Sequence, residues 1–297
     1  WQPPQPNVLE QAETLAAKAD AVVLCLGLSP RLEGEEMKVP VEGFHGGDRL
    51  TLDLPKPQQT LMERIVGLGK PTVLVLLNGS SLAVGWADQH IPAILEAWYP
   101  GQAAGTAIAD VLFGDYNPAG RLPVTFYQSV DQLPPFDNYD MQGRTYRFFH
   151  GEPLYPFGYG LSYSRFAYNR FVMPETVRAG EAVQISVDVR NDGALAGEEV
   201  VQLYVRDVEA SVPVPIHSLQ GVQRVLLQPG EVKTLNFTLQ PRQMTVIDEE
   251  MRRVVEPGEF EISVGGKQPR VKAVRDAATT QSLTKQLKVT GAAAVLP

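Results

Sequence analysis

A cluster of acidic residues follows the first strongly apolar segment of the chain. The loop at about residues 29–55 contains Glu33, Glu35 and Glu36, together with the pair Asp48–Arg49. If these carboxylates lie close together and away from water, repulsion and desolvation raise the pKa of at least one of them, which is the state that a general acid needs. The same composition also fits a solvated acidic loop, so both interpretations stay open at this level.

Other catalytic chemistries find little support in the sequence. His45 lies in the same loop, but no GxSxG nucleophile motif accompanies it, and the segment Asn-Gly-Ser at 78–80 does not match that motif. The 4 histidines and 1 cysteine are scattered, so no metal site is expected. No GxGxxG motif follows the first apolar run, which argues against a dinucleotide. We therefore expect neither a metal nor a cofactor.

The composition is that of an ordinary globular chain with about two domains. It has 297 residues, of which 44% are hydrophobic and 20% charged. The net charge of −8 and the lack of a basic stripe argue against nucleic-acid binding. No apolar run reaches the roughly 20 residues of a membrane span. The one cysteine, Cys25, excludes an intrachain disulfide, and its apolar surroundings predict a buried thiol.

Helical and apolar segments alternate through the first 113 residues. Apolar residues at helical spacing predict helices, and continuous apolar runs predict strands covered on both faces. This alternation is typical of a parallel sheet wrapped by helices, in which ligands bind beyond the carboxyl ends of the strands. The expected helices cover residues 8–18, 56–69, 80–89 and 102–113, and the expected strands cover residues 21–28, 72–77 and 93–98.

Residues 114–165 are rich in Gly, Pro and Tyr and predict a long, ordered loop region. Its aromatic residues Tyr155, Phe157, Tyr159 and Tyr163 alternate with Gly and Pro. Such rings stack on sugars or anchor one domain on another, and we favour the anchoring role.

From about residue 167 the hydrophobic period changes to two. About seven short strands over roughly 100 residues, separated by turn signals, fit an immunoglobulin-like or fibronectin-like β-sandwich. Residues 281–289 are expected to add one more strand. The alternating hydrophobic positions are Val183, Ile185, Val187 and Val189, then Val201, Leu203 and Val205, then Leu235, Phe237 and Leu239.

Several motifs, in order along residues 8–266, resemble the C-terminal half of a family 3 glycoside hydrolase of the β-glucosidase and β-xylosidase type. The most specific are YPGQ and GDYNPAGRLPVTF, within residues 97–126, and YPFGYGLSY, within residues 153–166. The others are EGEEM at 33–37, GGDR at 46–49, LDLP at 52–55, GKPTVLVLLNG at 69–79, GRTYRFF at 143–149, VRNDGALAGEEVVQLYVRD at 189–207, LQGVQRVLLQPGE at 219–231 and VEPGEFEISVG at 255–265.

The resemblance implies a three-layer α/β/α sandwich with a mostly parallel sheet of six strands, over residues 1–166. An immunoglobulin-like or fibronectin type III-like domain with a C-terminal tail would then occupy residues 167–297. In this family a (β/α)8 barrel comes first and supplies the nucleophilic aspartate. Such a barrel needs roughly 250 residues, and this chain has none to spare for it. The missing N-terminal barrel domain is therefore an expected partner.

The resemblance also implies that the acidic loop carries the acid/base glutamate of a retaining β-glycosidase, which acts on a β-glycoside or oligosaccharide. Glu35 is the expected residue, with Glu33 and Glu36 as alternatives. Asp48 and Arg49 are expected to orient the loop as an ion pair, or else to contact the substrate. Without the nucleophile, the isolated chain is expected to be inactive.

Two other interpretations remain. The same two domains would also serve as a non-catalytic carbohydrate-binding or scaffolding module, or as a separate polypeptide that assembles with a barrel subunit. The chain starts at Trp1 and shows no signal peptide, which suggests a processed or truncated N-terminus. Enzymes that it resembles are often exported, so a periplasmic or secreted location is expected.

Overall fold

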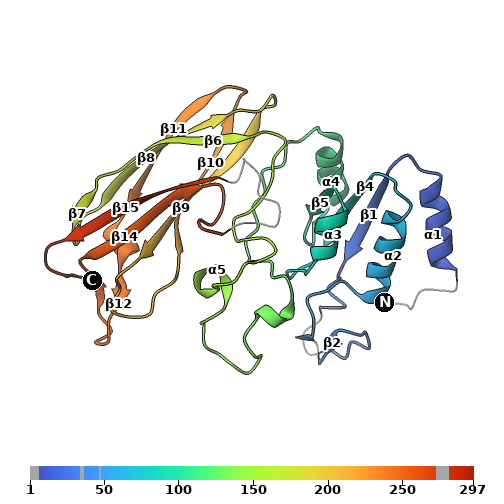
Figure 1. The fold of residues 1–297 in the computed structure, drawn as a ribbon, viewed down its shortest axis with the longest axis horizontal. Helices are drawn as coiled ribbons and strands as arrows, with labels where there is room; N and C mark the ends of the chain where they lie inside the picture. Colours follow the sequence, from blue (N-terminus) through green and yellow to red (C-terminus); the bar gives the residue numbers. More distant parts are fainter. Residues whose placement is uncertain (1–6, 34–36, 47, 272–280) are drawn as a thin grey trace. The chain divides into compact units, whose positions relative to one another are not determined.

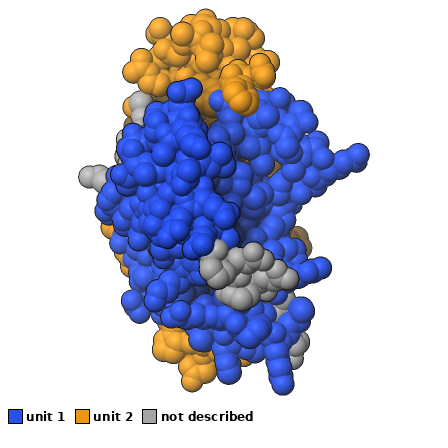
Figure 2. Space-filling view, turned by 90° about the vertical axis from the view of Figure 1, so that its right-hand side faces the viewer, with its two compact units in different colours: residues 1–112, 126–133 blue, residues 113–125, 134–297 orange. Residues whose placement is uncertain are grey.

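A computed structural model describes residues 7–33, 37–46, 48–271 and 281–297. The chain forms two compact units, coloured separately in Figure 2. Unit 1 comprises residues 1–112 and 126–133, and unit 2 comprises residues 113–125 and 134–297. The sequence-based domain boundary at residue 166 stays a prediction, although residues 134–166 group with unit 2 by their contacts.

Unit 1 is an α/β domain built on a parallel sheet. Its strands are β1 (Val22–Gly27), β4 (Thr72–Leu77) and β5 (Ala93–Glu96), in the order β1-β4-β5. Both pairings are parallel, as the alternation of elements predicted. The described residues place three strands in this sheet, whereas the resemblance implied six.

Four helices accompany the sheet, and α1 packs against α2 (Figure 1). The helix α2 buries Met62 and Ile65 and contacts β1. The third helix begins at Gly85 rather than at residue 80, because the backbone at Ser81 and Ala83 is engaged by Arg49 and Leu52. The helices are α1 (Val8–Ala17), α2 (Lys56–Val66), α3 (Gly85–His90) and α4 (Ala104–Phe113).

Only the central strand β4 is covered as the sequence predicted. Its consecutive residues Leu74, Val75 and Leu76 point to alternate faces and are all buried, so both faces of β4 are covered. On β1, in contrast, Val23 is 50% exposed and Cys25 is also exposed. The prediction of a buried thiol was therefore wrong: Leu24 and Leu26 are buried on one face of β1, but the other face, which carries Cys25, stays open among the described residues.

Gly27 closes β1 in a backbone conformation that requires glycine. Its φ is 140°, and an added Cβ would lie 2.1 Å from the carbonyl oxygen of Leu77 on the neighbouring strand. The Gln58 side chain donates to the Gly27 carbonyl and accepts from the Gly27 N–H, both at 2.7 Å. The end of β1, where the acidic loop begins, is thus held by β4 and α2 together.

We expect Gly27→Ala to destabilise the chain by about 2–4 kcal/mol, because the methyl group forces apart two paired strands. Chemical denaturation of the purified chain measures this loss. The matched control is Gly105→Ala in α4, where an added Cβ meets nothing within 4 Å. Helix propensity predicts a gain of about 1 kcal/mol or less for this control. Equal effects of the two substitutions would contradict the argument.

Unit 2 contains the predicted β-sandwich. The predicted alternating positions are buried, except for Leu235, which is partly buried against the core. The two sheets have the orders β10-β9-β14-β15-β7 and β11-β8-β6. Their strands are β6 (Phe166–Val172), β7 (Thr176–Arg178), β8 (Val183–Asn191), β9 (Gly197–Asp207), β10 (Ser218–Leu227), β11 (Val232–Leu239), β14 (Gly258–Gly265) and β15 (Ser282–Thr290).

The tail strand β15 confirms the extra strand expected near residues 281–289. It lies inside the larger sheet, antiparallel to β14 and parallel to β7.

The short elements of the chain are β2 (Phe44–His45), β3 (Asp48–Arg49), η1 (Val130–Gln132), α5 (Thr145–Phe148), η2 (Pro241–Met244), β12 (Val246–Ile247), β13 (Arg253–Val255) and β16 (Ala294–Leu296). None of the helices among the described residues is long and apolar enough to cross a membrane.

The loop region joins the sandwich through a buried ion pair. Arg121 Nη2 lies 3.0 Å from Glu199 Oε2 on β9, and the two side chains are 5% and 0% exposed. The Tyr168 hydroxyl donates to the other oxygen of Glu199 at 2.8 Å. Burial raises the pKa of the Glu199 carboxyl, and Arg121 opposes that shift. Arg121 is therefore the main compensation for a charge held inside unit 2.

Candidate active site

The loops that follow the three strands of unit 1 meet at the carboxyl edge of the sheet. Glu33 lies in the loop after β1, Gly79 and Ser80 follow β4, and Tyr99 follows β5. Gly79, Ser80 and Tyr99 lie 46 to 66 positions after Glu33 in the chain, yet all three contact its carboxylate. Because parallel strands end at one edge, this is where a sheet of this kind builds a binding site.

Glu33 accepts three hydrogen bonds, one from each of these residues. The Gly79 N–H donates to Oε2 at 3.0 Å, the Tyr99 hydroxyl donates to the same oxygen, and the Ser80 hydroxyl donates to Oε1. Both oxygens are therefore engaged by the protein itself. A general acid must instead present its proton to a substrate oxygen, so this geometry suits an anchor for the loop better than a proton donor.

Gly79 and Tyr99 shape this anchor. A Cβ at Gly79 would lie 2.7 Å from the Tyr99 ring and 3.1 Å from Glu33 Oε2, so only glycine lets the three residues meet. Burial raises the pKa of the Tyr99 hydroxyl above its ordinary value, and the adjacent Glu33 adds to the shift. Tyr99 consequently keeps its proton and remains a donor to Glu33.

Arg49 also forms hydrogen bonds at the same edge of the sheet. Its Nη1 donates to Ser80 Oγ at 2.9 Å and to the Ser81 carbonyl at 2.8 Å, and its Nη2 donates to the Asp53 carbonyl at 3.4 Å. Burial lowers the pKa of the guanidinium, while nearby Glu33 opposes that shift. These contacts favour the predicted role in orienting the loop. Asp48 is exposed, and Arg49's described side-chain hydrogen bonds go to Ser80, Ser81 and Asp53 rather than to Asp48.

The other predicted acid/base candidates, Glu35 and Glu36, lie outside the described residues. Glu33 is thus the candidate whose surroundings are known, and it is bound at the start of the Glu-Gly-Glu-Glu segment.

Glu96, which no sequence motif indicates, holds two of the converging loops. It ends β5, where its Oε1 accepts from the Trp98 N–H at 3.1 Å and its Oε2 accepts from Asn78 Nδ2 at 3.4 Å. Asn78 is fully buried and also donates to the Ser80 carbonyl at 2.9 Å. Trp98 has a left-handed φ of 55°, so Glu96 stabilises a strained turn just before Tyr99.

We expect Glu96→Gln to remove part of the pH dependence of stability. Burial raises the pKa of the Glu96 carboxyl from 4.5 to about 7. Because the folded state binds this proton more tightly, stability due to Glu96 is present below pH 4.5 and falls as the pH rises to about 7. The wild type should lose up to about 3 kcal/mol relative to Glu96→Gln over this interval. Urea titrations of both proteins from pH 4 to 8 measure the difference, and parallel curves would contradict it.

The sequence did carry signals for the residues that were missed. Asn78, Gly79 and Ser80 directly follow a buried strand, and Tyr99 begins the YPGQ motif. The predicted topology places both segments at the carboxyl edge of the sheet. Their contacts with Glu33 depend on loop conformation, which the local pattern does not predict.

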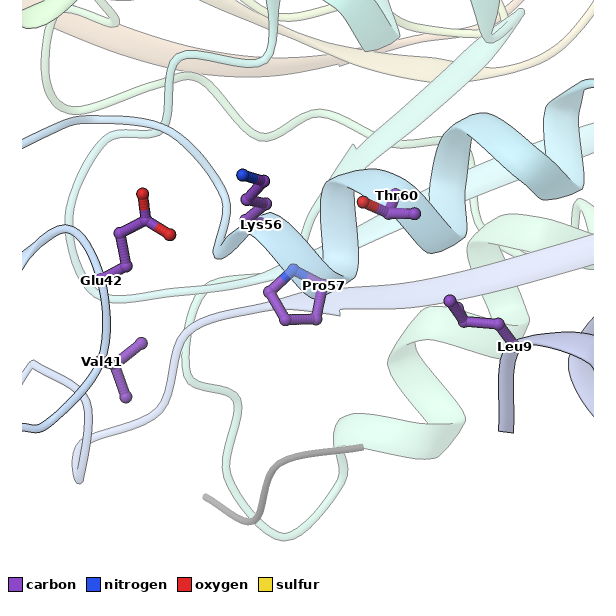
Figure 3. Close-up of a pocket in the computed structure, with 6 residues that line it drawn as sticks. All are labelled: Leu9, Val41, Glu42, Lys56, Pro57 and Thr60. Carbon is purple, nitrogen blue, oxygen red and sulfur yellow. The ribbon is translucent and has the colours of Figure 1, made fainter. Parts of the chain in front are cut away.

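Unit 1 also contains a hollow that does not add to this site. A hollow of about 290 Å³ beside α1 and α2 is lined by three apolar residues, a threonine, a lysine and a glutamate (Figure 3). It is lined by Leu9, Val41, Glu42, Lys56, Pro57 and Thr60. Within the described parts of the chain, no group of three or more His, Cys, Asp or Glu side chains could hold a metal ion.

Comparison with known proteins agrees with both the fold and the motifs. Residues 5–163 match the family model described as the glycosyl hydrolase family 3 C-terminal domain, and residues 199–268 match the fibronectin type III-like domain. The chain therefore pairs an α/β domain of carbohydrate-cleaving enzymes with a fibronectin type III-like sandwich. It belongs to glycosyl hydrolase family 3.

Individual relatives support this assignment. A xylan 1,4-beta-xylosidase of Xylanibacter ruminicola is 40% identical over 94% of this chain, and a periplasmic beta-glucosidase of Salmonella typhimurium is 37% identical over 89% of it. The crystal structure of a beta-glucosidase from Listeria innocua in complex with glucose superposes with a TM-score of 0.81 at 30% identity, over 98% of this chain.

The match covers only part of each relative. The chain spans 31% of the Xylanibacter ruminicola protein and 35% of the Salmonella typhimurium protein, and 39% of the Listeria innocua chain. It is thus similar to about a third of these proteins, as the resemblance to a C-terminal half implied.

Proposed function

We propose that this chain is the acid/base-bearing portion of a retaining β-glycosidase, which acts together with a (β/α)8 barrel outside the chain. The observation that carries the proposal is the convergence of three strand-end loops on Glu33. It holds Glu33, the first residue of the acidic segment, at the edge of the sheet where ligands of such folds bind. The coverage of the relatives leaves room for the barrel that would supply the nucleophile.

Within the acidic segment we propose Glu35 as the general acid/base, with Glu36 as the nearest alternative. Glu33 is the weaker candidate, because both of its oxygens accept hydrogen bonds from unit 1. In a retaining mechanism the acid/base protonates the leaving oxygen and then deprotonates the incoming water. Its carboxyl must lie roughly 5–5.5 Å from the nucleophile, so the acid/base residue has to reach the domain that carries the nucleophile.

The proposed substrates are β-glucosides and β-xylosides, because the relatives bear the names of enzymes for both sugars. The same relatives include a periplasmic enzyme, which favours a periplasmic or secreted location for the protein. The proposed partner is the barrel domain, and the proposed mechanism calls for no metal or cofactor.

Hydrolysis of p-nitrophenyl β-glucoside and β-xyloside tests the proposal. The chain is assayed alone and as a chimera, in which it replaces the matching third of the Xylanibacter ruminicola enzyme. We expect activity from the chimera and none from the chain alone. Activity from the chain alone would overturn the proposal, because it requires a nucleophile within these residues. A folded but inactive chimera would favour the alternative of a non-catalytic carbohydrate-binding or scaffolding module.

A further inference from the structure

The larger sheet of the sandwich has an unusually polar outer face. Along β9 the residues Val201, Leu203 and Val205 face the core, so Gln202, Tyr204 and Arg206 face outward. Glu261 on β14 pairs in register with Arg206, which places a carboxylate and a guanidinium side by side on this outer face. Polar groups on an outer face are ordinary when water covers them, but here protein covers most of them.

The loop of residues 142–158 forms this cover. The Tyr146 and Phe157 rings stack at 4.1 Å, and both meet the Tyr204 ring edge-on. Gln202 donates to the carbonyls of Gly158 and Gly266 at 3.0 Å. This end of the outer face is therefore closed by direct contacts.

At the other end the cover leaves a hollow of about 400 Å³, which we call the sandwich hollow. Its lining residues all belong to unit 2. They include Phe148, Phe149, Arg206, Asp207, His217 and Arg270. The hollow thus combines two aromatic rings with charged and polar side chains, and it contains none of the residues of the candidate active site.

The sandwich hollow presents both hydrogen-bond donors and hydrogen-bond acceptors. His217 is 2% exposed, and burial lowers its pKa to about 4, so at neutral pH its ring offers one donor and one acceptor. Arg206 forms no ion pair within the described chain and has its guanidinium donors available. Arg270 is bound to Glu261.

One carboxylate oxygen at the hollow is left without a donor by the described residues. Asp207 lines the hollow, and its Oδ2 is buried and has no hydrogen-bond partner. Buried acceptors without donors are costly, and native proteins seldom leave them so. A small rotation of the Asp207 side chain would let a ligand with hydroxyl groups in the hollow donate to this oxygen.

We propose that the sandwich hollow binds one or two pyranose units of a neutral oligosaccharide. Each sugar hydroxyl both donates and accepts, which matches a site that mixes carboxylates, guanidinium groups and a neutral imidazole. Phe148 and Phe149 line the hollow and add apolar surface to its polar groups, a combination that is common in ligand sites. The near balance of positive and negative side chains fits a neutral ligand better than an anion. The site lies in the sandwich unit and does not depend on the acid/base assignment.

Isothermal titration of the purified chain with xylobiose and with cellobiose tests this proposal. We expect saturable binding of at least one disaccharide, with a Kd of about 1 mM. Arg206→Ala should raise that Kd about tenfold, because it removes the unpaired donors. Phe149→Ala is a second variant that weakens binding without touching a charge, and circular dichroism verifies that both variants fold.

Two control variants show whether binding occurs at the sandwich hollow or elsewhere on the chain. Arg252→Ala removes an exposed guanidinium that pairs with Asp248 and Glu250, and it should leave the Kd unchanged. Tyr99→Phe alters the candidate active site and should also leave it unchanged. The proposal is wrong if neither disaccharide binds, or if binding survives both hollow variants. Binding of inorganic phosphate without binding of either sugar would overturn it as well, since that marks an anion site.

Discussion

In a chimera of this chain with a family 3 barrel, Glu35→Gln is expected to lower kcat by about 10²–10⁴-fold for a poor leaving group such as the sugar of xylobiose. Such a leaving oxygen departs only when it is protonated. With 2,4-dinitrophenyl β-xyloside, departure needs no proton, so formation of the glycosyl-enzyme should be spared. Azide needs no general base, so adding it should restore turnover of this substrate. Steady-state kinetics with the two substrates measure both effects.

The matched controls are Glu36→Gln and Glu33→Gln. Glu36→Gln should change kcat little for either substrate. Glu33→Gln weakens the hydrogen bonds from Gly79, Ser80 and Tyr99, so it should impair both substrates alike, without rescue by azide. If the leaving-group dependence and the azide rescue instead appear in Glu33→Gln or Glu36→Gln, the acid/base role belongs to that residue.

Removing Arg121 is expected to destabilise unit 2 by about 3–5 kcal/mol, because it leaves the Glu199 carboxylate buried without its ion-pair partner. Glu199 would keep the hydroxyl of Tyr168 as a donor. Thermal or urea unfolding of Arg121→Ala measures the loss. A double variant, Arg121→Met with Glu199→Leu, should recover much of it, since the unpaired charge is then absent.

The neighbouring ion pair provides a matched control. Arg224 pairs with Glu198, the residue next to Glu199, but the Arg224 side chain is 50% exposed. Arg224→Ala should therefore cost about 1 kcal/mol or less. If Arg224→Ala and Arg121→Ala destabilise the chain equally, burial does not decide the contribution of these pairs, and the argument fails.

Elements with a strong local pattern could be predicted from the sequence alone. The apolar run at Thr72–Leu77 became a central strand with the predicted bounds, and the period of two at Val183–Asn191 became a strand of the sandwich. Both patterns depend on which side chains face the core, and that alternation is set by the backbone geometry of a strand. The motifs in turn were sufficient to indicate the family that the comparisons show.

Exposure at the edges of a sheet could not be predicted in the same way. Cys25 lies in a run as apolar as that of β4, yet it is exposed. Burial depends on which elements cover the face of a strand, and among the described residues no neighbouring element covers the face of β1 that carries Cys25. Local hydrophobicity carries no information about such a neighbour.

By itself, therefore, the sequence determined the order of the elements, the two fold classes and the acidic segment that could do chemistry. Only the tertiary structure decided that Glu33 is held by Gly79, Ser80 and Tyr99, and that Arg121 pairs with Glu199 across 78 positions of the chain. The reason is physical: secondary structure follows from neighbours a few residues apart, whereas these contacts depend on how loops and sheets pack, which distant parts of the chain settle together.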